Sequence, residues 1–557
     1  MLLLVLASIA AAQQVSQPVV RLGNFIEVGN DVFMRIIAAI DARYITVENR
    51  DFEGRVRDRV NSRFPSDTSA QVTDSDAMWF LNRFGVEFKY QKSLELYLLF
   101  EHRQFVDGNL IDDRSNSTNP GGTDVFGRAA GTENPGFHTE RYWIDYKFPG
   151  TPLRLRVGAD LWNVDQAALV GDDDPRFALF GEFGDFDVMG AAVIQYESQR
   201  LGLENDNDLI YYTFSAGYNL KQHRVQFDVV YMRDRFLGAD TGSAAIQTRG
   251  GLGGQGQKTD AVMLSGSWSG AIGPVRALVQ GNLVGGTARG GTAGLPAATV
   301  TPGRDYNILG GAVVAYAEVD LGIVQPFVGV VFGTADGDPT DTKLHGFSPA
   351  SWQDVTQITE VSWFRHLETS TNFAARDYAC PARLQGLPRP GLTRAPLNVG
   401  TPVFGGGSGF ECSHSVTNPF NTRIGGGSHL GILTTYSNPG TLLIPVGLKA
   451  YPAKGHELVG WYVYRGMVNT TLLEVAFAPE LAGKGIGKAQ IHEVGGYWQW
   501  LLNPYFDIRL AGNIALLGSE FKDIARLADC DLRTAGVQAC DGNDAALKGE
   551  VRFRARF

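Results

Sequence analysis

Segments in which apolar and polar residues alternate recur along the whole chain, and the connections between them are long and short in turn. The tight connections include 91–93, 149–152, 184–185, 221–223, 322–324, 452–455 and 503–504. The other connections are long and rich in glycine, asparagine, aspartate and proline, which favour turns. Barrels that cross the bacterial outer membrane have short periplasmic turns and long extracellular loops, whereas a soluble sandwich has no reason to sort its loops by parity. The pattern therefore predicts a transmembrane β-barrel.

The alternating segments number eighteen, and single-chain bacterial barrels have an even number of strands. We therefore expect an all-β, antiparallel, up-and-down barrel of about eighteen strands, with both chain ends on the periplasmic side. The predicted strands are 34–46, 79–90, 94–106, 139–148, 153–162, 176–183, 186–196, 209–220, 224–236, 259–268, 275–284, 306–321, 325–334, 441–451, 456–468, 490–502, 505–517 and 547–557.

The last of these segments shows which face of a strand meets lipid. Leu547, Val551, Phe553, Ala555 and Phe557 alternate with Lys548, Glu550, Arg552, Arg554 and Arg556. A period of two places the two sets on opposite sides of a sheet. In a membrane barrel the apolar side faces lipid and the charged side lines a wet interior. The terminal aromatic residue also resembles the sorting signal of bacterial outer-membrane proteins.

The start of the chain indicates secretion. Residues 1–12 have the apolar core and the small residues of a signal peptide, although the usual basic beginning is missing and a buried helix is the alternative. We expect residues 13–33 to form a periplasmic N-terminal segment and residues 34–557 to form the barrel. No other segment approaches the roughly 20 apolar residues that a spanning helix needs.

All four cysteines lie in two predicted extracellular connections, 335–440 and 518–546. Pairing of Cys380 with Cys412 and of Cys530 with Cys540 fits an oxidising compartment, and four free thiols are the alternative. None of them forms a CxxC or CxxCH motif, so zinc ribbons and c-type haem are unsupported. The 335–440 connection is long enough to carry structure of its own, either folded into the lumen or covering the mouth.

Aromatic residues at strand ends fit the two girdles that flank the apolar band of a membrane barrel. We expect this position for Trp79, Tyr90, Trp143, Phe148, Trp162, Tyr196, Tyr231, Trp268, Tyr451, Trp498 and Trp500.

The faces opposite the apolar ones carry the candidate pore-lining residues. These are Arg35, Asp41, Arg43, Arg83, Glu87, Lys89, Arg141, Asp145, Lys147, Arg154, Arg156, Asp160, Arg509, Arg552, Arg554 and Arg556. Basic residues outnumber acidic ones in this set, although the chain as a whole has a net charge of −10. The wall formed by the first five strands and the last is therefore expected to be electropositive, which suits anions.

Two hypotheses account for these charges. The inward charges either pair with each other and only keep the wall hydrated, or the arginines form a ladder that binds carboxylates. In the second hypothesis Asp41, Asp145 and Asp160 orient the guanidinium groups, which bind carboxylates through two parallel hydrogen bonds.

Other kinds of function find little support in the sequence. The acidic balance argues against nucleic acid, and the glycine-rich stretch 251–256 is not followed by a helix that would make it a dinucleotide site. Asp336, Asp338 and Asp341 are weak calcium candidates, for which solvated acidic turns are the alternative. No serine and histidine stand together as a hydrolase would require, so neither an enzyme nor a cofactor is predicted.

The segment from Arg141 to Gly158, RYWIDYKFPGTPLRLRVG, resembles the alginate-export family of outer-membrane barrels. The match consists of an aromatic and acidic strand, a tight turn and a strand of the type Leu-Arg-Val-Gly. The resemblance implies an eighteen-stranded barrel with an arginine-rich lumen. The chain has Ala159-Asp160 where that family often has Arg-Gln, which leaves the substrate open.

These observations predict an outer-membrane channel for passive diffusion or export of anionic solutes, with acidic oligosaccharides among the candidates. Two alternatives are a plugged barrel that acts as a surface scaffold or binds a partner, and a sheath for a periplasmic electron carrier. The expected partners are the lipid bilayer, lipopolysaccharide and a small anionic or polyanionic solute, with a periplasmic or surface protein under the alternatives.

Overall fold

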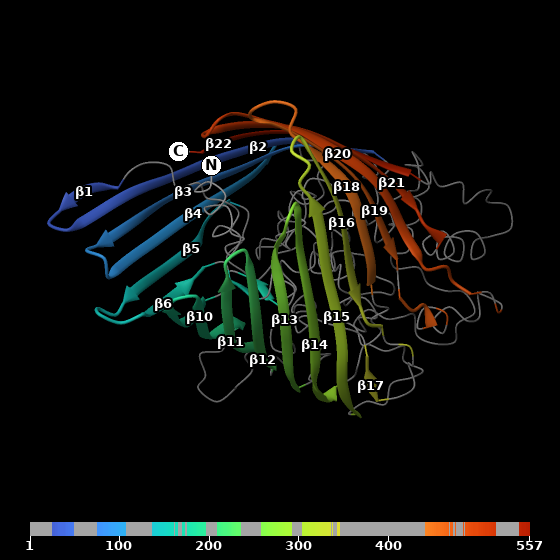
Figure 1. Cartoon of the computed structure of the whole chain (residues 1–557), viewed down its shortest axis with the longest axis horizontal. Coiled ribbons are helices and arrows are strands. Elements are labelled where there is room, and N and C mark those ends of the chain that lie inside the picture. Colours follow the sequence, from blue (N-terminus) through green and yellow to red (C-terminus); the bar gives the residue numbers. More distant parts are fainter. Residues whose placement is uncertain are drawn as a thin grey trace.

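Eighteen strands close into one antiparallel barrel (Figure 1). The structure is a computed structural model and describes residues 25–48, 75–106, 136–160, 162–164, 170–172, 175–196, 209–234, 258–291, 304–335, 337, 342–345, 441–466, 468–471, 474, 483, 485–519 and 545–556. The barrel strands are β2 (Val32–Glu48), β3 (Ser75–Tyr90), β4 (Leu94–Val106), β5 (Gly136–Lys147), β6 (Leu153–Ala159), β9 (Pro175–Phe183), β10 (Phe186–Tyr196), β11 (Leu209–Leu220), β12 (His223–Asp234), β13 (Lys258–Ile272), β14 (Val275–Gly291), β15 (Arg304–Val319), β16 (Val324–Gly333), β18 (Thr441–Ala450), β19 (His456–Gly466), β20 (Ala489–Asn503), β21 (Phe506–Leu517) and β22 (Ala545–Arg556).

The ends of the chain close the barrel. β22 pairs with β2, from Arg556 opposite Ala39 to Leu547 opposite Glu48, so the last strand lies beside the first (Figure 1). Each of these strands therefore pairs on both sides, as lipid requires, because hydrocarbon offers no partner for a backbone N–H or C=O. Every predicted segment overlaps one of the eighteen strands, and the antiparallel barrel is confirmed.

Among the described residues, four short strands lie outside this pattern and were not predicted from the sequence. β1 (Ile26–Gly29) pairs with the start of β2, and β17 (Lys343–Leu344) runs parallel to β15. β7 (Trp162–Val164) and β8 (Val170–Asp172) form a separate hairpin between β6 and β9. Two to four residues are too few for an alternation to be recognised.

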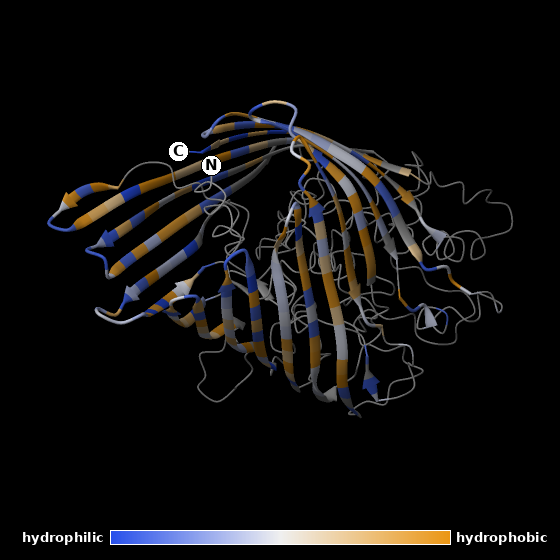
Figure 2. Ribbon diagram, viewed as in Figure 1, coloured by the Kyte–Doolittle hydropathy of each residue, from blue (hydrophilic) through white to orange (hydrophobic). Residues whose placement is uncertain are grey.

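The exposed large side chains on the outward face of the barrel are apolar. Along many strands, hydrophilic and hydrophobic residues alternate (Figure 2). Leu283, in the middle of β14, is 58% exposed, and Ile144 on β5 is 52% exposed. Exposed outward aromatic side chains lie near the short turns (Tyr90, Phe183, Tyr218, Trp500 and Phe506) and towards the other end (Tyr44, Tyr142, Phe177, Tyr212 and Tyr462). An apolar band between two aromatic girdles is the surface of a membrane-spanning barrel.

The inward face divides into two arcs. On β10–β20, which we call the neutral arc, many inward side chains are apolar and buried: Tyr211, Val230, Met263, Leu278, Val314, Val331, Leu443 and Val459. On β21, β22, β2–β6 and β9, which we call the charged arc, arginine and carboxylate side chains dominate. The predicted charged wall therefore occupies one side of the barrel interior.

None of the helical segments within the described residues has the length and apolar character needed to cross a bilayer.

Candidate functional site

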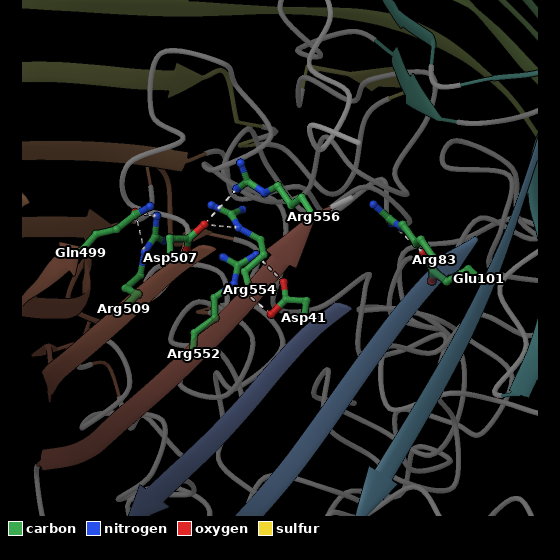
Figure 3. Close-up of polar contacts among 9 residues, drawn as sticks. All are labelled: Asp41, Arg83, Glu101, Gln499, Asp507, Arg509, Arg552, Arg554 and Arg556. Atoms are coloured by element: carbon green, nitrogen blue, oxygen red, sulfur yellow. Dashed lines mark hydrogen bonds and ion pairs between the residues drawn. The ribbon is translucent and has the colours of Figure 1, made fainter. Parts of the chain in front are cut away.

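The seam between the last and first strands gathers three arginines and two aspartates on the inward side (Figure 3). Arg552 donates two hydrogen bonds to Asp41, one of them from Nε to Oδ1 at 3.0 Å. Asp507 on β21 accepts a hydrogen bond from Arg554 at 2.7 Å and lies 3.3 Å from Arg556. The carboxylate of Asp507 thus contacts two guanidinium groups.

Arg509, next to this seam, contacts an amide and an aromatic ring. Its Nε and Nη2 donate to the amide oxygen of Gln499 at 3.1 and 2.5 Å, and its guanidinium lies 4.3 Å from the ring centre of Tyr497. The amide and the ring together orient the guanidinium group.

On the other side of the seam, β2–β4 carry ion pairs between neighbouring strands. Arg35 pairs with Glu87, which also lies 3.3 Å from Lys89. Arg83 pairs with Glu101 at 2.6 Å, and both side chains are buried (Figure 3). These carboxylates neutralise much of the positive charge on this part of the wall.

A second cluster lies on β5, β6 and β9. Asp145 accepts hydrogen bonds from Arg154 at 2.6 Å and from Arg156 at 2.9 Å. Arg156 also pairs with Asp160, whose backbone oxygen accepts a hydrogen bond from Arg176 at 2.9 Å. Asp145 and Asp160, for which we predict an orienting role, thus each contact two arginines. Arg141 is buried on β5 and also faces inward.

Trp143 departs from the predicted girdle position. It is 4% exposed, faces inward, and stacks on Tyr97 with ring centres 5.0 Å apart. The guanidinium of Arg156 lies 4.0 Å from the centre of its ring. Trp143 shares the parity of Arg141 and Asp145, so the alternation along the strand was a better guide than its aromatic character.

Sequence reasoning missed several inward charged residues. Arg176 begins a short strand whose only other charged residue of inward parity, Glu182, lies beside the turn, so no repeat drew attention to it. On the neutral arc, Arg224 makes two hydrogen bonds to Asp187, and Glu318 pairs with Arg276 and Lys449. Each of these groups stands on a strand whose other inward residues are mostly uncharged.

Some predicted features lie outside the described residues. These are the signal peptide, nearly all of the 335–440 connection, the side chain of Arg43, the calcium candidates Asp336, Asp338 and Asp341, and the cysteines Cys380, Cys412, Cys530 and Cys540. Lys147 is described and lies exposed beside the turn that follows β5. Within the described part of the chain, no group of three or more histidine, cysteine or acidic residues is placed to hold a metal ion.

No protein-family model and no curated protein sequence matches the chain. Solved structures that it resembles include OccK11 (OpdR) of Pseudomonas aeruginosa, with 9% identity and a TM-score of 0.43, and a BenF-like porin of Pseudomonas fluorescens Pf-5, with 8% identity and a TM-score of 0.43. Both comparisons cover 96% of this chain and 100% of the other. OprB of Pseudomonas putida is 10% identical with a TM-score of 0.41, covering 94% of each chain.

These likenesses are too weak to transfer a function or a substrate, and the resemblance to the alginate-export family stays a prediction. The assignment to a membrane rests on the barrel itself. Eighteen strands closed without an edge, an apolar outer band and aromatic girdles are the features of a bacterial outer-membrane protein. The protein lies in the bacterial outer membrane.

Proposed function

We propose that the protein is an outer-membrane channel through which anionic solutes diffuse passively along the charged arc. The observation that carries the proposal is the sharing of carboxylates. Asp145 contacts both Arg154 and Arg156, and Asp507 contacts both Arg554 and Arg556. A carboxylate that is divided between two guanidinium groups leaves donors able to bind a passing anion.

The arginines of the charged arc bind the solute but catalyse no reaction on it. A solute carboxylate exchanges places with water at one arginine and then at the next, and each arginine is kept in position by a fixed aspartate or ring. Movement is then driven by the concentration gradient and needs neither a nucleotide nor a catalytic residue. Acidic oligosaccharides, which carry one carboxylate on each sugar, are candidate solutes within this proposal.

A plugged barrel is the second candidate, and the burial of the charged arc favours it. Glu87 and Glu101 are fully buried and Arg83 is 8% exposed, whereas the wall of an open channel is wetted. The connection between β16 and β18 is long enough to supply a plug. In that case the barrel displays its loops to a surface or periplasmic partner, or surrounds an electron carrier.

Planar lipid bilayers separate the two candidates. We expect the purified full chain to produce stepwise ion currents in such bilayers. We also expect proteoliposomes that contain the protein to swell faster in sodium glucuronate than protein-free liposomes do. A barrel that conducts no ions at any voltage, even after residues 346–440 are replaced by a short glycine–serine linker, would contradict the channel and leave the scaffold. Heat-modifiable migration in SDS gels checks that this variant is folded.

A further inference from the structure

We propose that Arg154, Arg156 and Arg176 form a discrete binding site for one carboxylate group on the barrel wall between β6 and β9. The inference deepens the proposed channel function and rests on it for the path by which a solute arrives. The proposed channel function requires only a general preference for anions. The inference adds one defined site at which binding is saturable.

The pairing of β6 with β9 places the three guanidinium groups on one wall. Arg154 stands opposite Phe180, Arg156 opposite Ala178, and Gly158 opposite Arg176. The three arginines thus occupy successive inward positions, two residues apart along the strand direction, which is about 6.6 Å for extended chain. Gly158 has a φ of 134°, and a Cβ there would lie 2.2 Å from the backbone oxygen of Tyr142. Only glycine allows β5 and β6 to approach this closely.

Within this group the positive charges exceed the negative ones. Three arginines contact two aspartates, Asp145 and Asp160, through the ion pairs of Arg154 with Asp145, of Arg156 with both, and of Arg176 with Asp160. All five side chains are described and are at most 30% exposed. A surplus positive charge in a partly dehydrated group is costly, so the group is completed by one further anion.

Among the described residues, Arg176 is the one arginine of the three with a buried donor that lacks an acceptor. Its side chain is 4% exposed, and its Nε has no hydrogen-bond partner among the described residues. Among the described residues, the only carboxylate that it contacts is that of Asp160, which lies 3.5 Å away and is shared with Arg156. A buried donor without an acceptor is destabilising, and an incoming carboxylate oxygen supplies the missing acceptor.

Aromatic rings fix the other two guanidinium groups. Arg156 lies 4.0 Å from the ring centre of Trp143, and Arg154 lies 4.2 Å from that of Phe180. A guanidinium stacked on a ring directs the N–H groups of its edge at carboxylates, and here Arg156 contacts Asp145 and Asp160 while Arg154 contacts Asp145 through Nη1 alone among the described residues. Because Arg154 is 30% exposed while the other two are buried, the ligand approaches from the Arg154 side. The site therefore takes a compact solute with a single carboxylate, such as a sugar acid.

Isothermal titration calorimetry of the full chain in detergent tests the site, with sodium glucuronate as the probe and glucose as its uncharged match. We expect saturable binding of glucuronate, no binding of glucose, and a loss of affinity of about tenfold or more in Arg176→Gln, because a charge-assisted hydrogen bond is removed. Arg276→Gln, which removes an equal charge on the neutral arc, is the control and leaves the dissociation constant within about twofold. Asp160→Asn removes a competing acceptor and tightens binding, a gain that a misfolded variant does not produce.

The site is overturned if glucuronate binds the Arg176→Gln variant as tightly as the unmodified protein, or if glucose competes equally. Anion-selective currents that accompany such a result would leave the channel function intact. Conversely, glucuronate binding that depends on Arg176 in a barrel that never conducts would keep the site and contradict the channel.

Discussion

Arg552 of the last strand binds Asp41 of the first strand through two hydrogen bonds across the seam that closes the barrel. The two residues are 511 positions apart in the chain. Their pairing links the closure of the fold to the chemistry of the wall, because the aspartate that helps to join the ends also fixes one of the arginines proposed to meet the solute.

Removal of one partner of this pair is expected to destabilise the barrel. Asp41→Asn removes the carboxylate to which Arg552 donates two hydrogen bonds, and breaking a buried ion pair costs about 3–5 kcal/mol. Urea unfolding from lipid vesicles measures the loss. The double variant Asp41→Asn with Arg552→Gln should recover part of the free energy of unfolding, since both charges of the pair are then removed together. Equal losses in the single and double variants would show that the pairing is not the cause.

The lipid-facing band makes a prediction that depends on depth. Leu283→Arg places a charge on the outward face in the middle of β14 and should cost about 2–4 kcal/mol of unfolding free energy. Ile272→Arg, equally outward but beside a short turn, should cost about 0–1 kcal/mol. The two unfolding free energies, measured in the same vesicles, give the comparison. An unfolding free energy that neither substitution changes would argue against a lipid-exposed band.

Gly158 should tolerate no side chain. Its φ of 134° and the contact of 2.2 Å that a Cβ would make with the backbone of Tyr142 predict a loss of about 1–3 kcal/mol for Gly158→Ala. Gly281→Ala on β14 is the matched control, because a Cβ there meets nothing within 4 Å. Unfolding midpoints in urea distinguish the two, and an unchanged midpoint for Gly158→Ala would be evidence against the close approach of β5 and β6.

The sequence also predicts two disulfides, Cys380–Cys412 and Cys530–Cys540. Mass spectrometry of the unreduced protein should find no alkylated cysteine and should find each of these pairs in one cross-linked peptide. Alkylation of all four cysteines would refute the pairing.

The barrel was predictable because lipid outside and polar groups inside impose a two-residue alternation on the strands of the charged arc, and because the connections between strands are short and long in turn. Arg35, Arg83, Asp145 and Arg552 follow this rule and stand where it predicts. Trp143 was misplaced because aromatic residues favour both interfaces and stacking with arginine, and composition does not separate these roles. Arg176 was missed because the two inward residues that follow it, Ala178 and Phe180, are uncharged, so β9 shows no repeat of inward charges.

The partners of the inward charges were not predictable either. Arg552 contacts Asp41 although Arg554 is the residue directly opposite that aspartate, because a long side chain reaches diagonally across the pair of strands. The choice between paired charges and an arginine ladder depends on such contacts. The structure contains features of both, since each of Asp145 and Asp507 is paired, and each is shared between two arginines.

The reversal potential of the open channel in a tenfold gradient of potassium chloride tests the central claim most directly. The unmodified protein should select chloride over potassium, and the triple variant of Arg552, Arg554 and Arg556 to Gln should move the reversal potential towards zero, because three positive charges leave the wall. Lys221→Gln in a short turn, outside the barrel, should leave it unchanged. A cation-selective or unselective channel, or a triple variant identical to the unmodified protein, would contradict conduction of anions along the charged arc.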